Sequence, residues 1–334
     1  MGAEASKQEA PIRRKKDNKK PDRKPLPGEL PLKFLSDITK GFSADQKLGE
    51  GAFGVVYKGI LPSGEIIAVK KLRSSPADQD KHFQNEVVNL MVVEHENIVK
   101  LTGHCYEHGC KVVESNGQMM YNEAIDKLLC YEYLPEGSLD KHLFDDPCNL
   151  DWPMRFNIIN GICGGLRFLH EGYDNHPIIH LDLKPSNILL DGNMSPKIAD
   201  FGLSRLFGKQ QTRTYTQNVV GSIGYMAPEY LERGEITTKC DIYSLGMLII
   251  EITTGEKNSH PENDASGRFF IENVRQNWKN REYVTSKYSS LDSEHLTQIE
   301  TCIEIALNCV AAMPRDRPSI GQIIKTLQSG GASK

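Results

Sequence analysis

A glycine-rich run near the beginning of the chain sets the strongest limit on the fold. It leads directly into β-forming residues, and its members are Gly49, Glu50, Gly51, Ala52, Phe53, Gly54, Val55 and Val56. Glycines let backbone amides approach a phosphate closely, because no side chain stands in the way. A dinucleotide-binding turn should instead lead into a helix, and the sequence contains no G-x-x-x-x-G-K-S/T run of a P-loop. The run alone leaves two interpretations open, a phosphate-binding loop or an ordinary hairpin turn.

The first third of the chain has mainly β character. From Gln46 to Leu72, β-branched and aromatic residues are punctuated by glycines and one proline, which predicts three short antiparallel strands. An amphipathic helix is predicted next. The apolar residues on its face are Phe83, Val87, Leu90 and Met91. The polar segment of residues 107–127 then separates two strand-like segments, and we interpret it as a loop or a hairpin insertion.

Beyond Pro135 helical patterns dominate. The predicted helices run from Trp152 to His170, from Asp241 to Ile252 and from Gln298 to Val310. We therefore expect an α+β protein with a small β-rich lobe and hinge over residues 35–134 and a larger helical lobe over residues 135–328. Tails are expected at residues 1–34 and 329–334. The first should be disordered, because few of its side chains can be buried.

Composition argues against several other classes of protein. The 334 residues suit one large domain or two modest ones, and the net charge of -4 gives no global reason to expect a nucleic-acid partner. The longest apolar run, Leu245 to Ile252, is far shorter than the ~20 residues that cross a bilayer. Cys105 and Cys110 have no second Cys or His pair at zinc-finger spacing, so thiols are expected rather than a metal site. Reduced cysteines and no signal-peptide core favour an intracellular protein.

A lysine follows the apolar run Ile67-Ala68-Val69. Lys70 is costly to bury unless its ammonium meets anions, although an edge-strand lysine that faces solvent would fit the same pattern. Glu86 lies beside the apolar stripe of the predicted helix and offers a partner. Such a pair would hold Lys70 against phosphates.

The strongest chemical signal lies between residues 180 and 202, where the sequence reads H-L-D-L-K-P-S-N and later D-F-G. Phosphoryl transfer needs charge neutralisation and alignment more than covalent help. It calls for metal-binding oxygens, an acceptor near the incoming hydroxyl and a cation. This segment supplies Asp182, Lys184, Asn187 and Asp200. Asp200 and Asn187 carry the hard oxygen ligands that Mg²⁺ prefers. Solvated loop residues, the alternative, would not be expected in this combination and order.

Together these segments resemble the eukaryotic protein kinase domain. The resemblance covers roughly Leu35 to Leu327 and includes Ala227-Pro228-Glu229. It implies a bilobal kinase fold, ATP and Mg²⁺ as cofactors, and a protein substrate. It also implies that Arg317 pairs with Glu229 and that Asp241 begins a buried helix.

The resemblance assigns roles to individual residues. It implies catalytic roles for Asp182, Lys184 and Asn187, and Mg²⁺ binding by Asn187 and Asp200. The residues implied in ATP binding are Gly49, Glu50, Gly51, Ala52, Phe53, Gly54, Val55, Val56, Ala68, Lys70, Glu86, Tyr131, Glu132, Tyr133, Leu134 and Leu189. Within this set Tyr131 takes the gatekeeper position, and the backbone from Glu132 to Leu134 faces adenine.

Three further segments resemble plant receptor-like kinases. They are Glu136 to Asp140, Lys184 to Asp191 and Gly221 to Glu229. The insertion and the catalytic loop are similar to the cysteine-rich receptor-like branch. With no signal peptide, ectodomain or transmembrane helix in the sequence, the chain resembles a receptor-like cytoplasmic kinase, which implies a receptor kinase as a partner.

Lys184 beside Asp182 matches the serine/threonine pattern, so the resemblance implies a non-specific serine/threonine protein kinase. The alternative is a catalytically weak pseudokinase scaffold that binds a receptor or a partner kinase. A scaffold has no need to keep the full set of nucleotide-site residues. The sequence keeps Lys70, Glu86, Asp182, Asn187 and Asp200.

One position departs from the family pattern. The residue before Asp182 is usually an arginine, and here it is Leu181, as in non-RD kinases. That arginine normally meets a phosphate on the activation segment. The segment still offers hydroxyls at Thr212, Thr214, Tyr215, Thr216 and Ser222. Another basic residue, such as Arg205 or Arg213, would have to replace the missing arginine if phosphorylation switches the enzyme on.

The N-terminus fits a lipid anchor. Met1 to Ser6 matches the pattern M-G-x-x-x-S/T, which predicts myristoylation of Gly2. One myristoyl chain holds a protein only marginally, and the basic cluster from Arg13 to Lys24 would add attraction to the anionic inner membrane leaflet. The alternatives are a solvated charged tail in the cytoplasm and a nuclear-import signal.

Overall fold

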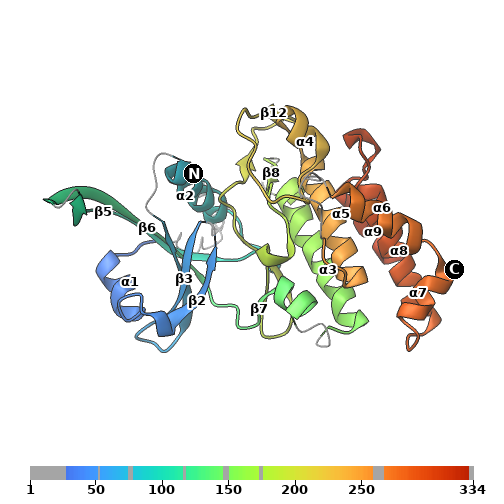
Figure 1. Ribbon diagram of the computed structural model, residues 1–334, viewed down its shortest axis with the longest axis horizontal. Helices are drawn as coiled ribbons and strands as arrows, with labels where there is room; N and C mark the ends of the chain where they lie inside the picture. The colour runs from blue at the N-terminus through green and yellow to red at the C-terminus, as the bar shows by residue number, and fades with distance from the viewer. Residues whose placement is uncertain are drawn as a thin grey trace, which may run out of the picture.

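The computed structural model describes residues 28–51, 53–73, 78–115, 118–145, 150–172, 176–258 and 267–330. Gly2, the basic cluster and Ala52 lie outside the described residues. Figure 1 shows two lobes, one built mainly on a β-sheet and the other mainly on helices. The expected α+β architecture with a smaller β-rich lobe first is therefore confirmed.

The small lobe contains a six-stranded sheet in the order β1-β5-β6-β4-β3-β2. Its strands are β1 (Gly28–Glu29), β2 (Lys47–Gly51), β3 (Gly54–Ile60), β4 (Ile66–Leu72), β5 (Leu101–Ser115) and β6 (Gln118–Glu132). Neighbouring strands pair antiparallel, except that β1 runs parallel to β5. The three strands predicted between Gln46 and Leu72 are β2, β3 and β4.

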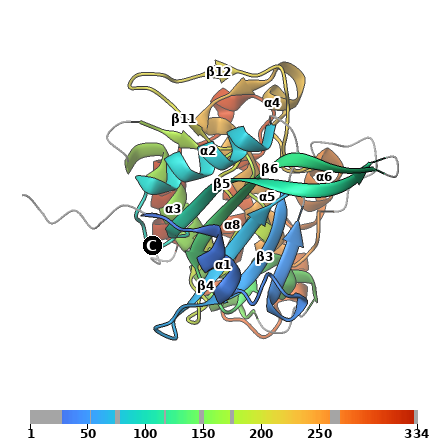
Figure 2. The same cartoon turned by 90° about the vertical axis from the view of Figure 1, so that its left-hand side faces the viewer.

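The segment of residues 107–127 belongs to a long β-hairpin formed by β5 and β6. Figures 1 and 2 show this hairpin extending beyond the rest of the small lobe. Of the two interpretations from the sequence, the hairpin insertion is correct and the loop is wrong. The sequence of this segment lacks a regular alternation of apolar and polar residues, so its pattern alone does not predict two strands.

Two helices pack on opposite faces of the sheet. On one face, α1 (Leu32–Ile38) inserts Leu35, which is 0% exposed, among Ile67, Val69 and Leu128. On the other face, α2 (Asp78–Met91) buries Phe83 and Val87. The tail expected at residues 1–34 is therefore too long. Residues 28–34 contribute β1 and the start of α1, whose apolar side chains cover the sheet.

Helices dominate the large lobe. They are α3 (Trp152–Arg167), α4 (Pro228–Arg233), α5 (Thr238–Thr254), α6 (Arg268–Asn277), α7 (Arg281–Lys287), α8 (Ser293–Cys309) and α9 (Ile320–Gly330). The central helix α5 is apolar almost all round and is buried along nearly its whole length, which is the pattern of a core helix. Because α9 continues to Gly330, the C-terminal tail begins later than the expected residue 329.

Short strands lie along the chain between β6 and α5. They are β7 (Gly137–Ser138), β8 (Ile178–Ile179), β9 (Ile188–Leu190), β10 (Pro196–Ile198), β11 (Arg205–Leu206), β12 (Thr214–Tyr215) and β13 (Glu235–Ile236). The pairs β8–β11, β9–β10 and β12–β13 are antiparallel. The catalytic segment runs from β8 to β9, and Asp200 follows shortly after β10.

Six free cysteines are buried within the described residues: Cys105, Cys130, Cys163, Cys240, Cys302 and Cys309. Burial raises the pKa of each of these thiols, which makes them poor nucleophiles and poor metal ligands. In the same part of the chain, no helix has the length and hydropathy to span a membrane.

Candidate active site

A cavity of about 620 Å³ lies between the two lobes. The expected site residues that line it are Gly49, Glu50, Gly51, Phe53, Gly54, Val56, Ala68, Lys70, Glu86, Tyr131, Glu132, Tyr133, Leu134, Lys184, Asn187, Leu189 and Asp200. Val55 is not part of the lining, because successive side chains along β3 point to opposite faces. Most of the sequence-predicted set is thus gathered around one cavity.

The glycine-rich run joins β2 and β3 and is both a hairpin turn and a wall of the cavity. A Cβ atom on Gly54 would lie 2.3 Å from the carbonyl oxygen of Lys71, so only glycine allows β3 to approach β4 here. The carboxylate of Glu50 is engaged by Lys47 at 2.6 Å and by Arg73. Any contact of Glu50 with a phosphate would therefore come from its backbone.

Lys70 lies between two carboxylates. Its Nζ is 3.2 Å from Glu86 Oε2 and 2.8 Å from Asp200 Oδ1, while only 12% of its side chain is exposed. Burial disfavours the charged ammonium, but Asp200 and Glu86 outweigh burial and raise the pKa of Lys70. The same ammonium lowers the pKa of Asp200 against its own burial. The interpretation of Lys70 as a solvent-facing edge residue is wrong, and the Glu86 partnership is confirmed.

Tyr131 provides a contact that the sequence did not predict. Its hydroxyl donates a hydrogen bond of 2.5 Å to Glu86 Oε1, so the two oxygens of Glu86 are shared between Tyr131 and Lys70. Burial, together with the nearby Glu86 carboxylate, holds the pKa of Tyr131 well above its usual value, so the phenol remains a donor. Register could have suggested this contact, since Lys70 pairs with Leu129 on the neighbouring strand, two residues from Tyr131.

The catalytic segment is held together around Asp182, which is only 4% exposed. Asp182 Oδ2 accepts a hydrogen bond from Asn187 Nδ2 at 2.9 Å and lies 3.0 Å from Lys184 Nζ. Asp182 Oδ1 accepts a hydrogen bond of 2.7 Å from the hydroxyl of Ser222. Lys184 in turn donates to the same hydroxyl at 2.6 Å. Ser222 thus joins the activation segment to Asp182 and Lys184, two of the three predicted catalytic residues.

Asp241 fixes the backbone of this segment from the buried helix α5. Its Oδ2 accepts from the N–H of His180 and its Oδ1 from the N–H of Leu181, both at 2.8 Å. Oδ2 also lies 2.9 Å from Nε2 of the buried His170, a contact that the sequence did not predict. Leu181 has a φ of 67°, which strains a residue with a branched side chain. The two hydrogen bonds that Asp241 accepts from this backbone offset the strain.

Asn187 and Asp200 are placed to supply oxygen ligands. The amide nitrogen of Asn187 is turned toward Asp182, so its carbonyl oxygen remains as an acceptor, and Asn187 and Asp200 both line the cavity. Asp200 uses one carboxylate oxygen for Lys70. A carboxylate and an amide oxygen are hard donors, so these two residues fit Mg²⁺ held jointly with the phosphates of a nucleotide. Among the described residues, no cluster of three or more His, Cys, Asp or Glu side chains could hold a metal by itself.

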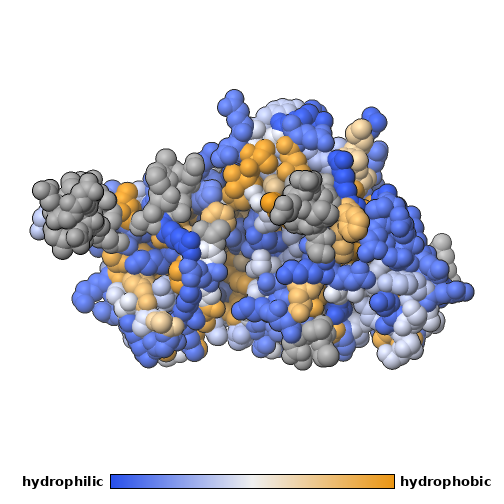
Figure 3. All heavy atoms as spheres, viewed as in Figure 1, coloured by the Kyte–Doolittle hydropathy of each residue, from blue (hydrophilic) through white to orange (hydrophobic). Residues whose placement is uncertain are grey.

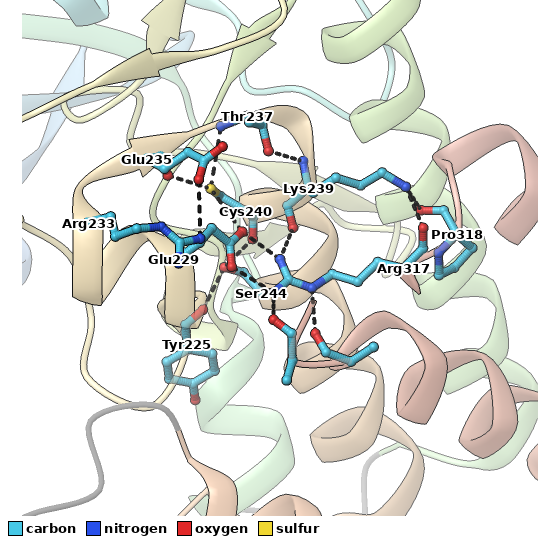
Figure 4. Close-up of polar contacts among 12 residues, drawn as sticks. Tyr225, Glu229, Arg233, Glu235, Thr237, Lys239, Cys240, Ser244, Arg317 and Pro318 are labelled. Atoms are coloured by element: carbon cyan, nitrogen blue, oxygen red, sulfur yellow. Dashed lines mark hydrogen bonds and ion pairs between the residues drawn. The ribbon is translucent and has the colours of Figure 1, made fainter. Parts of the chain in front are cut away.

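A buried ion pair supports the end of the activation segment. Arg317 Nη1 and Nη2 each lie 2.7 Å from one carboxylate oxygen of Glu229. Figure 4 shows the two side chains facing each other. The expected pairing of these residues is therefore confirmed. In the same view, Ser244 Oγ donates to the carbonyl oxygen of Tyr225 at 2.7 Å. Tyr225 and Glu229 thus fix the backbone that follows Ser222 to the large lobe.

Strand pairing and the side chain of Tyr230 hold the part of the activation segment that precedes Glu229. Strand β12 pairs with β13, and the N–H of Thr216 donates to the carbonyl oxygen of Gly234 at 2.9 Å. The hydroxyl of Tyr230 both donates to the carbonyl oxygen of Val220 and accepts from its N–H. Leu181 is 5% exposed and packs into the core.

The two candidate substitutes for the missing arginine face other groups. Arg205 Nη1 donates to the carbonyl oxygens of Leu203 and Ser204, and Arg213 lies 3.9 Å from Glu235.

This bilobal fold has a cavity between the lobes that is lined by Lys70 and Glu86 from one lobe and by Lys184 and Asn187 from the other. It defines a class of phosphate-transferring enzymes. Residues 42–327 match the protein kinase domain family, so the chain belongs to the protein kinase family.

The chain is similar to three proteins from Arabidopsis thaliana. The chain is similar to putative cysteine-rich receptor-like protein kinase 20, with 41% identity over 305 residues that cover 90% of this chain and 43% of the relative. It is 40% identical over 310 residues to cysteine-rich receptor-like protein kinase 36, which covers 91% of this chain and 44% of the relative. It is 41% identical over 307 residues to receptor-like serine/threonine-protein kinase SD1-7, which covers 90% and 34%. The chain therefore spans less than half the length of these relatives.

Proposed function

We propose that this chain is an active serine/threonine protein kinase that transfers the γ-phosphoryl group of ATP to a protein hydroxyl. The observation that carries the proposal is the network in which Lys70 links Glu86 to Asp200 while Asp182, Lys184 and Ser222 contact one another. The contacts of Lys70 with Glu86 and Asp200 suit the binding of nucleotide phosphates. The contacts among Asp182, Lys184 and Ser222 suit the positioning of an incoming hydroxyl. Relatives with serine/threonine kinase in their names support the choice of acceptor.

Each residue has a role that its position supports. Lys70, held by Glu86, would bind nucleotide phosphates at the glycine-rich run. Asp182 would orient the acceptor hydroxyl and take its proton, since its carboxylate is the acceptor within the network. Lys184 would neutralise charge that develops on the transferred group. The backbone of residues 132–134 would receive adenine at the far side of the cavity.

Mg²⁺ would be held by Asp200 and Asn187, whose free oxygens fit the ion. When bound, it would neutralise charge on the phosphates. The chain's own contribution is to keep these oxygens in place: Lys70 restrains Asp200, and Asp182 restrains Asn187.

The protein substrate would meet the activation segment. In the view of Figure 3 most of the surface is hydrophilic, while apolar side chains gather near the segment that carries β12. Exposed apolar residues of this segment include Ile223, which is 54% exposed one residue after Ser222. An apolar side chain of a bound peptide would find a partner there.

The proposal is tested by incorporation of radiolabelled phosphate. Wild type should phosphorylate itself and a generic protein substrate, while Lys70→Met and Asp200→Ala should each abolish both activities. Thermal melting of both variants should show that the fold is intact. Turnover at the wild-type rate in either variant would refute the assignment. A wild type that binds a partner kinase but transfers no phosphate would favour the pseudokinase scaffold instead.

We further propose that the kinase acts at the inner membrane leaflet next to a receptor kinase. The support is sequence alone, namely Gly2 in a myristoylation pattern followed by the basic cluster from Arg13 to Lys24. Wild type should fractionate with membranes, and Gly2→Ala should release it. Charge reversal from Arg13 to Lys16 should weaken membrane binding more at low salt, where screening is least. An unchanged distribution of Gly2→Ala would remove the lipid anchor from the proposal.

A further inference from the structure

The long hairpin presents different side chains to the two helices that flank its base. Tyr106 lies directly opposite Lys127, and Glu107 lies directly opposite Asp126. Successive side chains of a strand point to opposite faces, so these two cross-strand pairs face opposite sides of the sheet. One side faces α2 and the other faces α1.

The pair on the α2 side makes two contacts with that helix. The ring of Tyr106 lies 5.6 Å from the ring of Phe83, and Lys127 forms an ion pair with Asp80. The side chain of Lys127 is only 7% exposed, whereas that of Asp80 is 39% exposed. A lysine buried to this extent requires an anionic partner, and Asp80 in the first turn of α2 supplies it.

The pair on the α1 side contacts other elements. Glu107 Oε2 accepts a hydrogen bond of 3.0 Å from the N–H of Leu32, at the start of α1. Asp126 lies 3.5 Å from Lys71. The base of the hairpin is therefore fixed on both faces, by separate residues that can be changed separately.

The α2 residues that contact the hairpin lie on the same side of the helix as Glu86, which pairs with Lys70. Asp80, Phe83 and Glu86 are spaced by three residues, which places them along one side of the helix. The C-terminal half of α2 is attached elsewhere: Asn85 donates to the carbonyl oxygen of Gly202, and Asn89 donates to Ser204 Oγ. The hairpin thus holds the half of α2 that precedes Glu86.

We propose that Lys127 and Tyr106 are positioning residues, which hold the first turns of α2 so that Glu86 meets Lys70. The inference rests on the proposed function, because it assumes that the Lys70–Glu86 pair serves ATP binding. Without the Lys127–Asp80 pair, the first turn of α2 loses its charged attachment and opens more often. Glu86 then spends less time beside Lys70, and ATP binding weakens before any chemical step does.

Lys127→Met is the decisive variant, because methionine fills similar space and leaves only the half-exposed Asp80 unpaired. We expect the KM for ATP to rise about fivefold, equivalent to about 1 kcal/mol, with a smaller change in kcat. Hydrogen exchange of α2 amides should accelerate. Lys127→Arg should keep the wild-type KM, and Asp80→Lys combined with Lys127→Glu should restore part of it.

Glu107→Ala is the matched control, since it removes a hairpin contact on the opposite face. It should leave the KM for ATP and the exchange of α2 unchanged, even where it lowers the melting temperature. A wild-type KM and wild-type α2 exchange in Lys127→Met would overturn the inference, as would an equal rise in KM in Glu107→Ala. Failure of the proposed function is a different result, in which wild type itself neither binds Mg-ATP nor transfers phosphate.

Discussion

Arg317 and Glu229 form a two-pronged ion pair inside the large lobe, with side chains that are 0% and 1% exposed. Arg317 also donates to the carbonyl oxygens of Ala311, Ala312 and Lys239, so its guanidinium has partners in several directions. The pair links the segment before α9 to the start of α4. One ion pair therefore joins two segments of the large lobe that are far apart in sequence.

Breaking this pair should destabilise the whole lobe. Arg317→Met would leave the Glu229 carboxylate buried without its cation, which typically costs about 3–5 kcal/mol. Urea unfolding followed by circular dichroism measures the loss. The double variant with Glu229→Met should recover most of it, because no unpaired buried carboxylate then remains. A single variant as stable as wild type would contradict the expectation.

Phosphorylation of the activation-segment threonines should matter little. Leu181 offers no charge to a phosphate, and the segment is already ordered by β12–β13 pairing and by Tyr230. Replacing Thr212, Thr214 and Thr216 with alanine should change phosphorylation of an added substrate by less than about tenfold, or ~1.4 kcal/mol in barrier. Ser222 is left intact, because it contacts Asp182 directly. A hundredfold loss in a folded triple variant would show that a basic residue substitutes for the missing arginine.

Gly234 should be far less replaceable than those threonines. Its φ is 62°, and a Cβ atom there would lie 2.0 Å from the carbonyl oxygen of Thr216. Gly234→Ala should therefore separate β12 from β13 and raise the KM for a peptide substrate by about tenfold or more. Gly255→Ala is the matched control. It has a φ of 69° at a helix end, but its nearest neighbour is the side chain of Arg155 at 3.4 Å. Equal effects from the two variants would mean that backbone strain alone is responsible.

Glu251 predicts a pH dependence of stability. It is fully buried, and burial raises its pKa from 4.5 to about 7 despite hydrogen bonds from Asn258 and Tyr225. Between these two pKa values the folded state binds more protons than the unfolded state, so stability falls as pH rises. The loss should total about 3 kcal/mol and level off above pH 7.

Glu251→Gln keeps the shape of the side chain and removes its titration. Unfolding free energies of wild type and this variant, compared from pH 4.5 to pH 7.5, should diverge in favour of the variant as pH rises. Parallel curves would show that Glu251 does not titrate in this range.

The sequence predicted the parts of the site that depend on local pattern. Lys70 and Glu86 were identified because a charged residue within an apolar element needs a partner. The strands β2 to β4 and the main helices were expected from periodicity, with boundaries shifted by a few residues. Arg317 and Glu229 came from the family resemblance, since nothing local connects residues so far apart in sequence.

What could not be predicted depends on contacts between distant segments. The hydrogen bond from Tyr131 to Glu86 and the approach of His170 to Asp241 exist only once the strands and helices have packed. The role of Lys127 was hidden for a similar reason. A lysine in a polar insertion is usually solvated, and its burial depends on the position of α2. The structured part of residues 28–34 was missed, because its few apolar residues adjoin a highly charged tail.

The buried thiols allow the unfolding of each lobe to be followed separately. Cys105 and Cys130 belong to the small lobe, whereas Cys163, Cys302 and Cys309 lie in the core of the large lobe. A thiol reagent reaches each sulfur only after the surrounding lobe has opened. In a chain with Cys110 and Cys148 replaced by serine, mass spectrometry after a labelling pulse would identify the modified thiols. The time at which each thiol becomes modified would show when its lobe opens. One and the same molecule would then report whether its two lobes unfold together or in turn.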